Sequence, residues 1–100
     1  MTELEKARGI INQCDREMAE LFEKRMDAVR VLAEYKKEHG IPVEDLHREE
    51  EIIKKNSSLI KNDEYRSHYV SFLRQTIDVS KSMQRRLLDG MKTAKRCLRK

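Results

Sequence analysis

The sequence predicts an all-α protein in which the chain forms a long helix, a short helix and a second long helix. Apolar residues recur at helical spacing over most of the chain, and no segment shows the alternation of a strand. Glycine and proline are scarce, with three glycines and one proline among 100 residues. Turn and cap residues gather in two places, at residues 39–45 and 56–63, so the chain divides into three helices.

The first helix is expected over residues 2–36. Thr2 followed by Glu5 is typical of a capping box, and no proline interrupts the helix before the stop at Gly40 and Pro42. Its apolar seam, in alternating steps of three and four residues, consists of Leu4, Ala7, Ile11, Cys14, Met18, Leu21, Ala28 and Leu32.

The length of this helix predicts a dimer. About 35 residues at 1.5 Å per residue give a rod of roughly 50 Å, whereas a compact 100-residue monomer has a radius of gyration of about 13 Å. Such a rod must bury much of its seam outside its own chain. We therefore expect an intertwined homodimeric helical bundle.

The second and third helices follow a short loop. Asp45 is a candidate N-cap for the second, with an apolar face formed by Ile52, Ile53, Leu59 and Ile60. Asn62-Asp63 can cap the third, and Gly90 can end it. The third helix has an apolar stripe of Tyr65, Tyr69, Phe72, Leu73, Thr76, Ile77, Met83, Leu87 and Leu88.

Composition narrows the class of protein. The chain is 40% charged with a net charge of +4, and without the five basic residues of 91–100 it is close to neutral. We read 1–90 as the domain and 91–100 as a basic tail, more typical of a solvated end than of a nucleic-acid contact. No apolar run approaches the ~20 residues of a membrane span, and the N-terminus does not resemble a secretory signal. We therefore expect a cytoplasmic protein that binds neither membrane nor nucleic acid.

Polar residues interrupt the apolar stripes of all three helices. Lys36 follows Arg25 by eleven residues, which returns it to within about 20° of the same helix face. Either these cations pair with glutamates of neighbouring helices, or they line a pocket for a small dianion, since arginine forks and amide donors suit carboxylates. The inward polar residues are Arg25, Lys36, Arg48, Glu49, Ser80 and Gln84.

Arg8 stands apart from this set. It precedes Arg25 by 17 residues, or about 25 Å along a straight helix. Taken alone, Arg8 is best explained as a solvated residue near the helix start. In an antiparallel dimer, however, it could reach the pocket of the partner chain.

The residues point to no catalytic nucleophile, metal or cofactor. The chain has no Ser/His/Asp set, no glycine-rich phosphate loop and no zinc spacing. An enzyme built this way must act by positioning and electrostatics.

Taken together, the chain resembles the all-helical chorismate mutases over roughly residues 4–89. The matching parts, in order, are Arg8, Asp15, Glu23-Lys24-Arg25, Lys36, Gly40-Ile41-Pro42-Val43, Asp45-Leu46-His47-Arg48-Glu49, and the Ser80/Gln84 pair.

This resemblance implies the rearrangement of chorismate to prephenate, a step towards phenylalanine and tyrosine, in a homodimer with shared active sites. It implies that Arg25, Arg48 and the Arg8 residue of the second chain bind the substrate carboxylates, with Ser80 as a further donor. Lys36 and Gln84 would donate to the ether oxygen. Glu49 would accept from the ring hydroxyl, next to the backbone of Asp45.

Two alternatives remain open. Isochorismate pyruvate-lyase shares this fold and resembles the mutase in its arginines, lysine and glutamine, but we expect that lyase to lack a carboxylate at the position of Glu49. The other alternative is a non-catalytic helical dimer that binds nucleic acid or protein. It predicts basic residues on an outer face, whereas Arg25 and Lys36 lie on the seam.

Overall fold

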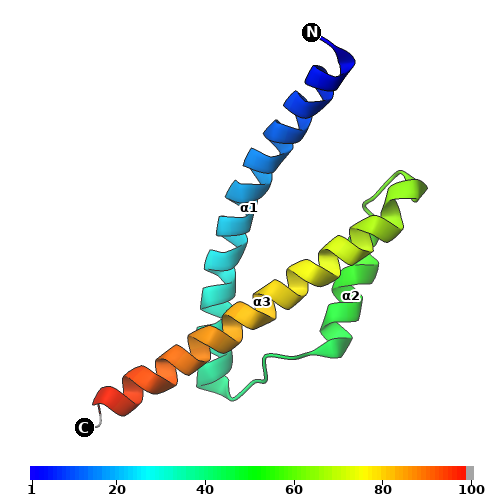
Figure 1. The fold of residues 1–100 in the computed structure, drawn as a ribbon. Helices are drawn as coiled ribbons and strands as arrows, with labels where there is room; N and C mark the ends of the chain where they lie inside the picture. The colour runs from blue at the N-terminus through cyan, green and yellow to red at the C-terminus, as the bar shows by residue number, and fades with distance from the viewer. Residues whose placement is uncertain (99–100) are drawn as a thin grey trace.

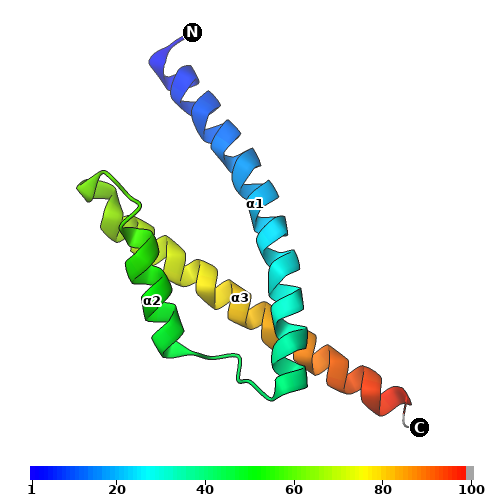
Figure 2. The same cartoon turned by 180° about the vertical axis from the view of Figure 1, so that it is seen from behind.

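Three helices and no strand make up residues 1–98, the part of the chain that the computed structural model describes; side chains are described for residues 1–90. The helices are α1 (Glu3–His39), α2 (Leu46–Ser57) and α3 (Asp63–Leu98). In Figures 1 and 2, α3 crosses the C-terminal half of α1, and α2 lies along the N-terminal part of α3. The predicted order of long, short and long helices is confirmed.

The helix ends follow the predicted cap residues. Thr2 Oγ1 accepts from the N–H three residues later at 3.1 Å, and Asp45 Oδ1 does the same at the start of α2 at 3.0 Å. Asn62 Oδ1 accepts from an N–H in the first turn of α3 at 2.9 Å. Gly40 ends α1 with a φ of 64°, a left-handed conformation that glycine adopts without a Cβ clash. The cap residues therefore determine where the two loops between the helices begin and end.

Two predicted details of the helices are wrong. Gly90 does not end α3, which continues to Leu98, because one glycine costs only about 1 kcal/mol in a helix interior and its neighbours are good helix formers. Leu59 and Ile60 do not belong to α2, which ends at Ser57, and Leu59 is exposed. The basic side chains of residues 91–100 lie outside the described side chains.

α3 is the common support of the other two helices. Apolar side chains of α1 are buried where it crosses α3, and a second apolar cluster joins α2 to α3. α1 and α2 do not pack against each other within the described residues, so a space remains between them above α3. The buried apolar residues are Met26, Val29 and Ala33 of α1, Ile53 of α2, and Leu73 and Ile77 of α3.

The N-terminal half of α1 extends away from the rest of the chain (Figure 1). Its apolar side chains are exposed, including Ile10 at 67% and Leu21 at 63%. The radius of gyration is 18.0 Å, well above the ~13 Å of a compact monomer of this size. The homodimer remains a prediction, and this exposed seam is the surface that it requires. Among the described residues, no helix is long and apolar enough to cross a membrane.

Candidate functional site

A cavity of about 450 Å³ lies between α1 and α2, with α3 as its floor. Apolar residues, among them Val29, Leu32, Ile52 and Ile77, form part of its wall. The cavity brings together all but one of the residues predicted from the sequence: Arg25, Lys36, Asp45, Arg48, Glu49, Ser80 and Gln84.

Arg25 reaches the cavity from α1 and is held by Ser80 of α3. The Arg25 guanidinium donates to Ser80 Oγ, and Ser80 Oγ donates in turn to the backbone carbonyl of Thr76 at 3.0 Å. Ser80 is buried, with 6% of its surface exposed. Its single hydroxyl proton is thus used within α3, so Ser80 orients Arg25 in this structure.

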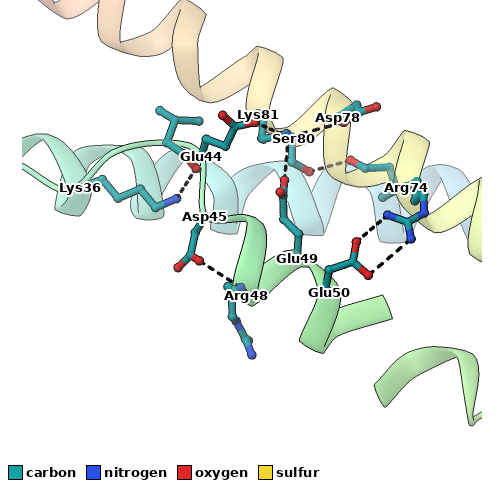
Figure 3. Close-up of polar contacts among 12 residues, drawn as sticks. Lys36, Glu44, Asp45, Arg48, Glu49, Glu50, Arg74, Asp78, Ser80 and Lys81 are labelled. Atoms are coloured by element: carbon teal, nitrogen blue, oxygen red, sulfur yellow. Dashed lines mark hydrogen bonds and ion pairs between the residues drawn. The ribbon is translucent and has the colours of Figure 1, made fainter. Parts of the chain in front are cut away.

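Lys36 reaches the cavity from the last turns of α1. Its ammonium donates to the carbonyl of Val43 in the α1–α2 loop at 3.1 Å (Figure 3). Neither Arg25 nor Lys36 forms an ion pair with any described residue. The expected alternative, in which these two cations pair with glutamates of neighbouring helices, is therefore wrong for both. Two half-buried cations instead face the cavity without an acidic partner.

Glu49 lies on the opposite wall and is paired with Lys81 of α3. The Lys81 ammonium is 2.7 Å from Glu49 Oε1, and only 14% of each side chain is exposed. Lys81 also lies 3.5 Å from Glu44 and 3.7 Å from Asp78. This close ion pair with Glu49 is the main cause that raises the pKa of Lys81 above its usual value.

Lys81 lines the cavity but was not among the residues predicted from the sequence. It directly follows Ser80 and so lies about 100° around the helix, at the edge of the polar stripe. Three acidic residues, at 44, 49 and 78, compete for it. Nothing in the spacing selects this lysine, because its partner lies on another helix.

Arg48 differs from the expectation that it shares the inward face of α2. Its side chain is 63% exposed, lies 3.7 Å from Glu51 of the same helix, and points away from Glu49 and Ser80 in Figure 3. The buried residue of α2 is Ile53, one turn after Glu49, so Glu49 is at the centre of the inward face and Arg48 at its edge. Arg48 therefore lines the rim of the cavity.

Gln84 is the most buried polar residue of the site, with 4% of its surface exposed. It lies one turn after Ser80 on α3. Its amide oxygen is buried and has no hydrogen-bond partner among the described residues. The Gln84 oxygen is thus an acceptor without a partner among the described residues, in a side chain that lines the cavity.

Arg8 is the predicted residue that the cavity does not include. It lies on the exposed N-terminal half of α1. Since α1 is one continuous helix from Glu3 to His39, Arg8 and Arg25 are about 25 Å apart along its axis. Arg8 cannot reach the cavity of its own chain.

The ionisable residues of the cavity favour a doubly negative ligand. Four cations face two carboxylates there, which leaves two positive charges at neutral pH. Arginine and lysine bind carboxylates through charge-assisted hydrogen bonds, and the apolar wall strengthens such bonds by excluding water. The cations are Arg25, Lys36, Arg48 and Lys81, and the carboxylates are Asp45 and Glu49.

Comparison with known families identifies the family of this chain. The model of the family described as chorismate mutase type II matches residues 7–85. The chain belongs to this family. No curated protein and no solved structure gave a match.

The part of the chain that matches the chorismate mutase type II family includes every residue predicted for the site. The matched range begins just before Arg8 and ends just after Gln84. The all-helical fold agrees with this assignment, and the resemblance seen in the sequence is confirmed at the level of the family. The roles of the individual residues are matters of proposal.

Proposed function

We propose that this protein is a chorismate mutase that converts chorismate to prephenate in the synthesis of phenylalanine and tyrosine. The observation that supports it most is the pair of cations, Arg25 and Lys36, that face a half-apolar cavity without an acidic partner, in a chain of this family. We assign the reaction to residues 1–90, with 91–100 as a basic tail, and the protein to the cytoplasm.

The first task of the site is to fold a flexible dianion into a reactive shape. Arg25, fixed by Ser80, would bind one carboxylate, and Arg48 would turn in from the rim to bind another with Arg8 of the second chain. Holding the two reacting ends together lowers the activation barrier, because the loss of conformational entropy occurs on binding, when the near-attack conformer forms. No nucleophile or cofactor is needed for such a unimolecular rearrangement.

The second task is to stabilise the charge that develops as the C–O bond breaks. Lys36 can leave the Val43 carbonyl and donate to the ether oxygen, and the NH2 group of the Gln84 amide, which lines the same cavity, can donate beside it. Donors aimed at charge that grows in the transition state accelerate the reaction more than they tighten binding. Glu49 would accept from the ring hydroxyl, near the backbone of Asp45.

A homodimer completes this proposal. The exposed seam of α1 offers the surface, and a two-fold axis would bring Arg8 of each chain to the cavity of the other. The carboxylate of Glu49 favours the mutase over an isochorismate pyruvate-lyase on the same fold, which we expect to lack it.

The test is to incubate the purified protein with chorismate in the presence of a metal chelator and to measure prephenate. We expect prephenate to form, and Arg25→Ala to lose most of the activity. Arg30→Ala is the matched control, because Arg30 is exposed on the same helix and does not line the cavity. In parallel, isochorismate is supplied and pyruvate is measured. A folded protein that releases pyruvate from isochorismate but leaves chorismate unchanged would be the lyase.

A further inference from the structure

We propose that Lys81 is a positioning residue of this site: it holds the Glu49 carboxylate towards the cavity and cancels its charge, so that a dianionic substrate can bind beside an acid. This inference rests on the proposed function and adds a residue to it. Lys81 acts through Glu49 and does not itself touch the reacting atoms.

The geometry of the pair supports this role. Lys81 Nζ and Glu49 Oε1 are 2.7 Å apart, and both side chains are mostly buried, in contrast to the exposed pairs elsewhere on the chain. Figure 3 shows Glu49 extending from α2 towards α3, beside Ser80. A buried carboxylate is costly without a partner, so the lysine fixes where the Glu49 oxygens lie.

The charges in the cavity explain why Glu49 needs a basic partner. A carboxylate is a stronger acceptor for a substrate hydroxyl than a neutral group, yet an unpaired carboxylate repels a dianion. The neutralised pair leaves Glu49 free to accept a hydrogen bond through its second oxygen without an excess negative charge. Lys81 contributes one of the four positive charges in the cavity.

Other charged groups around the pair are arranged consistently with this role. Glu44 in the loop and Asp78 on α3 lie 3.5 and 3.7 Å from Lys81, farther than Glu49, which is its nearest acidic partner. Arg74 of α3 also feels the charge of Glu49 but is committed to Glu50 at 2.9 Å. From α1, Arg25 and Lys36 face the cavity across from the pair, without an acidic partner of their own.

The experiment measures KM and kcat for chorismate in Lys81→Met, Lys81→Arg, Glu49→Gln and the double variant Lys81→Met/Glu49→Gln. We expect Lys81→Met to raise KM about 3- to 100-fold, the range that Coulomb's law gives for like charges about 6 Å apart at effective dielectric constants from about 80 to 20. Lys81→Arg should restore most of the affinity. Lys81→Met should also lower kcat, because it releases Glu49; in the Glu49→Gln background it should change kcat by less than twofold, because no carboxylate is left to position.

Arg74→Met is the matched control. It breaks another ion pair between α2 and α3, made by Arg74 Nη1 to Glu50 Oε1 at 2.9 Å, without touching the large cavity. It should leave KM unchanged, which separates the role of Lys81 from simple docking of α2.

Three results would overturn the inference. An active parent whose KM is unaffected by Lys81→Met refutes it. An equal fall in kcat in the Glu49→Gln background shows instead that Lys81 acts on the substrate directly and not through Glu49. A folded parent that leaves chorismate unchanged refutes the proposed function and, with it, this role, and that outcome is visible before any variant is measured.

Discussion

Mixing two inactive variants tests whether the site is shared between chains. Arg8→Ala and Arg25→Ala should each be nearly inactive as homodimers, because each removes one carboxylate-binding arginine from both sites. The distance of about 25 Å between these residues along the unbroken α1 means that a single site cannot draw both from one chain. The two defects therefore fall in the same site of a mixed dimer, and the other site is intact.

The expected recovery follows from this geometry. If the two variants are unfolded together and refolded at equal concentration, random pairing makes about half of the dimers mixed. Each mixed dimer has one intact site and one site with both defects, by the reciprocity of a two-fold interface. The mixture should therefore regain about a quarter of the activity of the parent refolded in the same way.

The assay is the rate of prephenate formation, with subunit exchange followed separately by a mass tag on one variant. The control mixes Arg25→Ala with Lys36→Ala. Both residues line the cavity of the same chain, so every site in that mixture carries at least one defect and no activity should return. Recovery in the control, or no recovery from Arg8→Ala with Arg25→Ala despite confirmed exchange, would refute the shared site.

Two further predictions concern the donors to the ether oxygen. Lys36→Ala should lower kcat by a factor of about 10²–10³ and change KM much less, because its donor acts on charge that grows in the transition state. Steady-state kinetics on chorismate measure both constants, with Lys24→Ala, a change at an exposed residue, as the control. An unchanged kcat would remove Lys36 from the mechanism. Gln84→Glu should make kcat rise as the pH falls, because only a protonated carboxyl group can donate there; a pH–rate profile as flat as that of the parent would contradict the contact.

The sequence predicted what depends on local signals. Gly40, Asp45 and Asn62 mark helix ends by capping rules that act within a few residues, and the structure bears out all three. The inward position of Ser80 and Gln84 followed from helical spacing alone, and both are buried.

What escaped prediction depends on side-chain choices between helices. The Glu49–Lys81 pair requires the distance between α2 and α3, and any of several acids could have paired with that lysine. Arg48 lies at the edge of the inward face of α2. The centre of that face is known only from the packing of Ile53, which the sequence does not show. Gly90 shows the opposite case, where a local stop signal was overridden by its neighbours.

The separation of α1 from α2 has a consequence for how such a site can change in evolution. The cations of α1 and the acid of α2 are joined through α3 and one loop, without direct packing between their helices. In their effect on the free energy of unfolding, substitutions in one wall should therefore combine nearly additively with substitutions in the other, because the two helices do not pack together. The Glu49–Lys81 pair can then be exchanged in a lineage while Arg25 and Lys36 keep the roles that we propose for them. A scaffold arranged in this way can acquire selectivity for a related enol-ether acid by successive small steps, without first losing the means to bind it.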